Sequence, residues 1–216
     1  MVEKFERELN ELKNKIVEMG EYSKRMLEMS MEALVKQDVP LAERVIEMRK
    51  RLPEFDKEIE ERALKMIALY QPVAKDLRTL GCILKMTEHL FRIGRYGREI
   101  AQIAKELSGR PHVKKLVDLT YVCRITCEMI NDALEAFRTE NLEKIKDLGE
   151  RDSVVDEIRH SIFRECLTYM LENPKNITPC MNYVMIARYL ERCADHACEI
   201  AEKVYYMVTG ERIEID

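Results

Sequence analysis

Apolar residues recur every three or four positions over most of the chain. One such run near the N-terminus consists of Phe5, Leu9, Leu12, Ile16 and Met19. This spacing places the apolar side chains on one face of an α-helix, so that face can be buried while the others stay in water. The pattern continues between widely spaced breaks, and the sequence therefore predicts an all-α protein.

Short segments containing Pro, Gly, Asn or Asp interrupt the helical pattern at regular distances. They are residues 38–40, 71–72, 108–111, 139–141 and 173–174. These five breaks leave six helical segments of about thirty residues each. Asp38 and Asn141 are expected to cap the second and fifth helices at their N-termini, and Gly210 to end the last helix. Pro53 lies inside the second segment, where a proline removes a hydrogen bond, so a kink is expected there.

The second half of the chain repeats features of the first half at an offset of 100 to 103 residues. At this offset Arg92 aligns with Arg192, and the breaks between helices correspond. A duplication with short connections predicts two tandem antiparallel three-helix bundles, one in residues 1–109 and one in residues 110–216. A single six-helix bundle is the alternative.

Composition limits the location and the class of the protein. The 216 residues are 46% hydrophobic, which is enough for a core, and the start of the chain is charged, so we expect no secretory signal. No apolar stretch approaches the ~18 residues of a membrane-spanning helix. The seven cysteines are scattered and odd in number, which indicates reduced thiols, and Cys123 and Cys127 lack the second pair that a zinc site requires. A cytoplasmic protein is expected.

The charge is distributed unevenly between the two halves. The net charge of −4 argues against a nucleic-acid-binding protein, which needs a basic surface. Residues 1–110 hold 22 basic and 20 acidic side chains, whereas residues 111–216 hold 14 and 20. The acidic excess of the protein therefore belongs to the second half.

Acidic residues four positions apart occur on two helices of this second half. Such residues stack on one helix face, and carboxylates brought together repel one another unless a polyvalent cation binds between them. If the two helices are antiparallel neighbours, both pairs can meet. The candidate metal ligands are Asp152, Asp156, Glu191 and Asp195. His160 continues the helix face of the first pair and Glu199 that of the second pair, and both are further candidates.

Other interpretations of these residues stay open. Arg151, Arg188 and Arg192 are close enough in sequence to pair with the carboxylates on a solvated face. A di-iron enzyme would need two inward-facing Glu-x-x-His motifs, and the chain has one, from Glu157 to His160. The remaining histidines, at positions 89, 112 and 196, have no evident partner and are assigned to the surface or to packing. No phosphate-binding loop, nucleophile elbow or dinucleotide motif is present.

Two segments resemble signatures of the PhoU family, the regulators associated with phosphate uptake. Residues 71–78 read QPVAKDLR and resemble the family's QPxAxDLR signature, and residues 190–197 read LERCADHA and resemble its LERxxDHA signature. Gly210 and the residues after it resemble the family's C-terminal ending, so the resemblance covers essentially the whole chain. It implies two tandem three-helix bundles, in agreement with the repeat.

The resemblance also implies where metal is bound. The family motif is Glu or Asp, three residues and then Asp, on the second and third helices of each bundle. The four carboxylates match it in the second bundle and imply a metal ion or small metal cluster, with iron as the first choice and zinc or manganese as alternatives. In the first bundle Arg49, Pro53, Phe91 and Arg95 stand at these positions, which suggests that this bundle has no metal cluster.

The first bundle is basic where its metal motif is missing. The residues concerned include Arg49, Arg92, Arg95 and Arg98. We expect either an ordinary solvated or salt-bridged face, or a site that contacts phosphate, an acidic partner or anionic lipid headgroups.

The resemblance implies a function through binding other proteins and not through catalysis. The expected role is a cytoplasmic negative regulator of the phosphate ABC transporter and of phosphate signalling. The expected partner is the transporter's ATPase subunit, and a sensor histidine kinase is a further candidate. A homodimer is also expected, and membrane association only through a partner. The alternatives are a metal-dependent helical-bundle enzyme, in which the carboxylates activate water or oxygen, and a metal-free helical scaffold.

Overall fold

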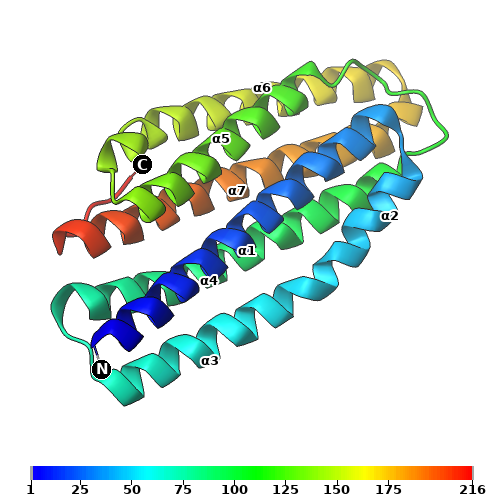
Figure 1. Cartoon of the computed structure of the whole chain (residues 1–216). Helices are drawn as coiled ribbons and strands as arrows, with labels where there is room; N and C mark the ends of the chain where they lie inside the picture. Colours follow the sequence, from blue (N-terminus) through cyan, green and yellow to red (C-terminus); the bar gives the residue numbers. More distant parts are fainter. Residues whose placement is uncertain (1, 216) are drawn as a thin grey trace.

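A computed structural model describes residues 2–215, and every regular element in this range is helical (Figure 1). The long helices are α1 (Val2–Lys36), α2 (Val39–Met48), α3 (Leu52–Tyr70), α4 (Ala74–Glu106), α5 (Val117–Thr139), α6 (Leu148–Glu172) and α7 (Ile177–Thr209). The 3-10 turns η1 (Arg49–Arg51), η2 (Leu142–Ile145) and η3 (Pro174–Asn176) lie between them. The predicted all-α class is confirmed.

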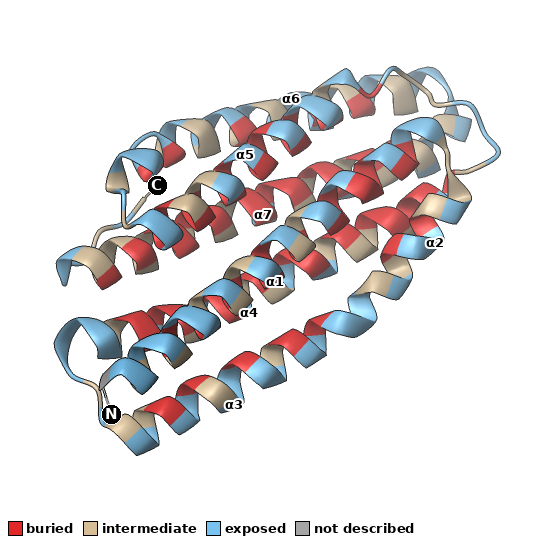
Figure 2. Cartoon of the chain, viewed as in Figure 1, coloured by how far each residue is buried: buried red, intermediate tan, exposed pale blue. Residues whose placement is uncertain are grey.

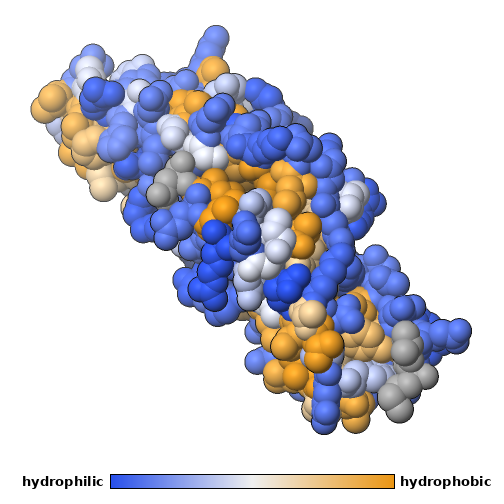
Figure 3. Space-filling model, turned by 90° about the vertical axis from the view of Figure 1, so that its left-hand side faces the viewer, coloured by the Kyte–Doolittle hydropathy of each residue, from blue (hydrophilic) through white to orange (hydrophobic). Residues whose placement is uncertain are grey.

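The helices form two three-helix bundles that lie side by side (Figure 1). In the first bundle α1 and α4 pack together and the α2–α3 segment covers them; in the second, α5 and α6 pack on α7. Contacts of α4 with α7 and of α1 with α5 join the two bundles. Buried residues line the helix faces that are turned toward one another (Figure 2). On the outer face that Figure 3 shows, hydrophilic residues surround smaller hydrophobic patches. The tandem arrangement of antiparallel bundles agrees with the sequence prediction.

The second helical segment is broken at the place where a kink was expected. Helix α2 ends at Met48, the η1 turn follows, and α3 begins at Leu52. Pro53 therefore lies in the first turn of α3, where its missing N–H would have no helical acceptor. The interruption falls where it was predicted, and it takes the form of one 3-10 turn through which the backbone stays in the right-handed helical region.

Two of the three predicted helix caps have the expected form. The Asp38 carboxylate accepts a hydrogen bond of 2.9 Å from the Leu41 N–H at the start of α2, and Gly210 ends α7 at a φ of 81°. The prediction for Asn141 is only partly right. Its side chain caps the η2 turn by accepting from the Glu143 N–H at 3.1 Å, and α6 begins later, at Leu148.

The connection between the bundles is anchored by His112. Its Nε2 lies 3.0 Å from the Leu34 carbonyl oxygen, and its Nδ1 lies 3.0 Å from the Tyr183 hydroxyl. Because a carbonyl can only accept, Nε2 donates and Nδ1 accepts the hydroxyl proton of Tyr183. This histidine is a satisfied packing residue, as the sequence indicated, and it ties the linker to α1 and to α7.

Candidate metal centres

The predicted ligands Asp156 and Glu191 lie level with each other across the contact between α6 and α7. Arg159 of α6 connects them: its Nε is 3.4 Å from Glu191 Oε2 and 4.0 Å from Asp156 Oδ1. Arg188 forms a second ion pair with Glu191. The two helices are antiparallel, so residues from different helices meet in pairs along the line of contact, which we call the α6–α7 seam.

The other two predicted ligands, Asp152 and Asp195, lie one helical turn further along α6 and α7. Because the helices are antiparallel, the register that brings Asp156 level with Glu191 places Asp152 and Asp195 at the next level of the seam. Asp195 pairs with Arg192 at 3.2 Å. Burial raises the pKa of the Cys198 thiol on α7, and the negative charges of Asp152 and Asp195 raise it further.

The chemistry of the seam suits a cation. Glu191 is only 7% exposed, and a buried carboxylate requires a counter-charge, which Arg159 and Arg188 supply in this structure. An all-carboxylate set of oxygen donors fits a hard or borderline cation, including iron, manganese and zinc. As arranged within residues 2–215, the four side chains do not converge on one point. The donor set fits, and metal binding at the seam stays a prediction.

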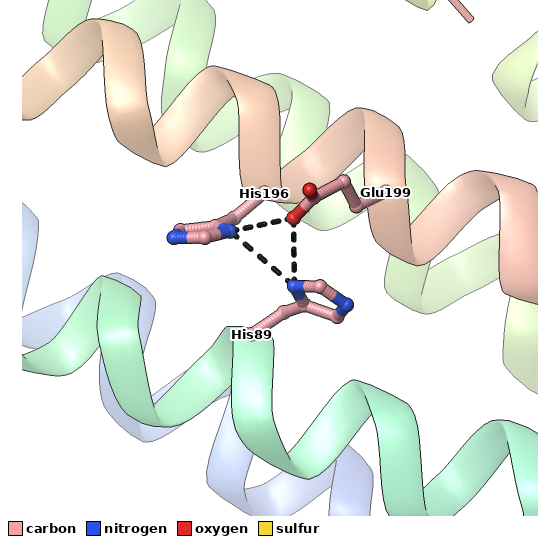
Figure 4. Close-up of side chains that lie close together, drawn as sticks. All are labelled: His89, His196 and Glu199. Atoms are coloured by element: carbon pink, nitrogen blue, oxygen red, sulfur yellow. Dashed lines mark hydrogen bonds and ion pairs between the residues drawn. The ribbon is translucent and has the colours of Figure 1, made fainter. Parts of the chain in front are cut away.

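The two further candidate ligands lie apart from this seam. His160 is exposed, and its Nε2 lies 2.9 Å from a guanidinium nitrogen of Arg159. Glu199 turns toward α4, where it meets His89 and His196 (Figure 4). Glu199 was expected to continue the carboxylate face of α7, and the structure instead makes it part of a different group.

The basic residues of the first bundle are partly neutralised. Arg92 pairs with Glu88 at 3.2 Å, and Arg98 pairs with the neighbouring Glu99. Arg49 and Arg95 are exposed and form no ion pair within the described part of the chain. The region therefore combines a salt-bridged face with two cationic side chains that remain available to an anion.

The group of His89, His196 and Glu199 was missed in the sequence, where these histidines had no evident partner. The described residues contain no other set of three such donor atoms that lie within 4.8 Å of one another. The signal that could have found it is the internal repeat, because residues 89 and 196 lie on the third helix of each bundle. Only knowledge of how α4 crosses α7 brings them together.

The cysteines behave as predicted. All seven are free and buried. Burial raises the pKa of Cys82 to about 12, and the hydrogen bond between Cys127 and Cys123 raises the pKa of the Cys127 thiol. Their burial agrees with the prediction of reduced thiols that pack as small apolar residues.

Comparison with known proteins adds to this geometry. The family model described as PhoU domain matches the chain twice, over residues 16–104 and 119–204, with one match in each bundle. The chain belongs to the PhoU family. The two matches cover most of both bundles, as expected for a duplicated PhoU chain.

Relatives over nearly the full length share this family. Two proteins named phosphate-specific transport system accessory protein PhoU homolog are each 37% identical to the chain. The one from Rhizobium meliloti aligns over 95% of this chain and 87% of its own length, and the one from Aquifex aeolicus over 98% and 96%.

Solved structures of PhoU proteins have the same fold. The crystal structure of PhoU from Pseudomonas aeruginosa superposes with a TM-score of 0.91 at 30% identity, covering 96% of this chain and all of that one. PhoU from Streptococcus pneumoniae, described as a phosphate transport system regulatory protein, gives a TM-score of 0.89 at 25% identity, covering 97% and 99%. Helices α6 and α7, which carry the seam, lie within this shared PhoU fold.

Proposed function

We propose that this protein regulates phosphate uptake, restraining a phosphate ABC transporter by contact with its ATPase subunit. The observation that carries the proposal is the presence of two PhoU domains in a chain whose relatives are named accessory proteins of the phosphate-specific transport system. These relatives are accessory or regulatory proteins, so the chain is a regulator and not an enzyme.

The expected location follows from the partner. No helix among residues 2–215 is long and apolar enough to cross a bilayer. A protein that binds the ATPase subunit of an ABC transporter acts in the cytoplasm and reaches the membrane only through that subunit. A sensor histidine kinase as a second partner and a homodimer belong to the same proposal, and sedimentation of the purified chain tests the dimer.

Exposed apolar side chains follow α6 and α7 at intervals of four residues. We call them the hairpin strip: Phe163, Leu167, Leu171, Ile177, Met181 and Met185. Leu171 is 87% exposed at the tip of the hairpin. Because several exposed apolar side chains on one helical hairpin are typical of sites of protein association, the strip supports a protein partner, and the transport-system names of the relatives favour the transporter's ATPase as that partner.

A pull-down with a double variant tests this surface. We expect Phe163→Asp/Leu167→Asp to lose recovery of the ATPase subunit under phosphate-replete conditions. The matched control is Leu64→Asp/Leu69→Asp, which changes two exposed leucines of α3 in the other bundle and should retain it. Equal recovery by both variants would remove the strip from the proposal, and a loss of self-association in the first variant alone would assign the strip to a homodimer.

A metal ion or small metal cluster at the α6–α7 seam completes the proposed function. The carboxylate pairs Asp156/Glu191 and Asp152/Asp195 would hold it, with iron the first choice and zinc or manganese the alternatives. The bound cation would supply positive charge that holds α6 and α7 together where arginines do so in this structure. Elemental analysis tests the site: Asp156→Ala/Asp195→Ala should lose the metal of the parent, whereas a parent without metal under every loading condition would refute it.

A further inference from the structure

Three side chains from two helices meet where the two bundles are in contact. His89 comes from α4, and His196 and Glu199 come from α7 (Figure 4). Glu199 Oε2 lies 2.8 Å from Nδ1 of each histidine, and the two Nδ1 atoms are 3.3 Å apart. All three donor atoms therefore point to one small region between α4 and α7.

The two imidazole rings are held in this orientation by their surroundings. The side chains of His89 and His196 are only 13% and 12% exposed, whereas Glu199 is 46% exposed. The Tyr96 ring stacks on His196 at a centroid distance of 6.1 Å. Nε2 of His196 is buried and has no hydrogen-bond partner among the described residues, so the polar contacts of this ring are made at Nδ1 alone.

The protonation states suit a divalent cation. Burial lowers the pKa of His89 although the nearby Glu199 charge opposes this, which favours the neutral imidazole. Burial alone would raise the pKa of Glu199, but its interactions with the two histidines, first among them the hydrogen bond from His196, outweigh burial, and the pKa lies below its ordinary value. Metal ligands must be neutral imidazole and ionised carboxylate.

The internal repeat provides a second group at the equivalent place, with different chemistry. Residues 89, 96 and 99 correspond to residues 189, 196 and 199 at an offset of 100. Where the first group pairs His89 with His196, the second stacks Tyr96 on Tyr189 at 5.5 Å. Glu99 lies near Tyr189, because its charge adds to the effect of burial in raising the pKa of that phenol. One half of the contact thus has metal-binding side chains and the other half has not.

The distances match the requirements of a tetrahedral ion. Zinc binds imidazole nitrogen and carboxylate oxygen at about 2.0–2.1 Å, so two of its ligand atoms lie about 3.3 Å apart. The two Nδ1 atoms already have this separation, and Glu199 Oε2 has to withdraw by only about half an ångström. We infer that His89, His196 and Glu199 form a binding site for a divalent ion of the zinc type, with water as the fourth ligand, that connects the two repeats.

The site is accessible and separate from the α6–α7 seam. A groove between α4 and α7, lined by His89, Glu88 and Lys203 among others, leads to it from solvent. His196 follows Asp195 in sequence but faces α4, whereas Asp195 faces α6. Because the ligands come from both repeats, bound zinc would fix the position of α4 against α7 and stabilise the folded chain.

Zinc titration of the full chain tests the inference. We use Asp152→Asn/Asp156→Asn as the background, because it removes the α6 half of the carboxylate seam without changing α7. Calorimetry should find one equivalent of zinc in this background, and adding His89→Gln should weaken binding at least tenfold. With zinc at about 100 times the Kd of the background, the thermal midpoint should rise by roughly 5–10 °C in the background and by at most about half as much with His89→Gln.

The matched control is Glu99→Gln, which changes the corresponding carboxylate of the tyrosine group. It should bind zinc as the background does. Equal zinc affinity with and without His89 would overturn the site. Cobalt provides a spectroscopic readout in the same background. The chain should show the strong visible bands of a four-coordinate, nitrogen-bound ion, and weak bands alone, typical of oxygen-only octahedral coordination, would also overturn the site.

Discussion

Replacing Gly97 by alanine tests the contact between α1 and α4, which builds the first bundle. Gly97 lies inside α4, and a Cβ added there would be 2.9 Å from the Met26 carbonyl carbon and 3.0 Å from the Leu27 nitrogen. Both are backbone atoms of α1, which cannot rotate away as the end of a side chain could. Gly81, on the same helix, has no atom within 4 Å of an added Cβ.

Both substitutions gain the higher helix propensity of alanine, but only Gly97→Ala also forces a close contact with the backbone of α1. Alanine is favoured over glycine in a helix by about 1 kcal/mol, so Gly81→Ala should stabilise the protein by about that amount. At Gly97 the two helix backbones must separate by about half an ångström, and overpacking of this kind costs about 1–3 kcal/mol. Because the obstacle is backbone, we expect the upper part of this range and a net loss of about 1–2 kcal/mol.

Urea denaturation followed by circular dichroism measures both variants against the parent. We expect the midpoint to rise for Gly81→Ala and to fall for Gly97→Ala, with a difference of about 2–3 kcal/mol between the two variants. In thermal unfolding, 1 kcal/mol corresponds to a shift of about 2–4 °C for a chain of this size. If Gly97→Ala is as stable as Gly81→Ala, α1 and α4 do not pack as described.

Three other predictions use different features of the chain. Arg49→Glu/Arg95→Glu should weaken binding of phosphate or anionic vesicles, measured by calorimetry and co-sedimentation. The control Arg92→Gln, which removes an arginine already paired with Glu88, should change this binding little. Identical binding by all forms would show that the basic face is only solvated or salt-bridged. The hydrogen bond from Lys75 and the charges of Lys75 and Lys13 outweigh burial and lower the pKa of Glu140 from its ordinary 4.5. The ionised carboxylate therefore contributes about 0.5 kcal/mol of stability above pH 4.5, and this contribution is lost as the pH falls through the lower folded-state pKa. Glu140→Gln should destabilise the protein at pH 7 and not at pH 3, and an equal effect at both pH values would contradict this. The seven buried cysteines should react with a thiol reagent slowly in the native protein and completely in denaturant, and rapid native reaction would show that they are exposed.

The helices and their grouping could be predicted because they depend on local signals. Apolar spacing of three and four residues marks each buried face, and Asp38 and Gly210 end helices by contacts within a few residues. The form of the break before Pro53 was harder to predict from the sequence, because it depends on how α2 and α3 pack on α4.

The carboxylate pairs could be placed from the sequence, because residues four apart share a helix face and α7 follows α6 as an antiparallel neighbour. Their present partners could not. Arg159 was not among the arginines considered, yet it bridges Asp156 and Glu191, since it is the α6 residue that reaches across the seam at their level. Glu199 was placed on the wrong surface because the face of α7 that meets α4 depends on how the bundles pack.

We have proposed that this PhoU-family chain acts by binding the phosphate transporter. A pull-down with the purified chain under phosphate-replete conditions measures that binding. We expect the ATPase subunit of a phosphate ABC transporter to be recovered, and recovery to fall when phosphate is removed. Recovery of an unrelated partner, with no transporter subunit in either condition, would contradict the claim.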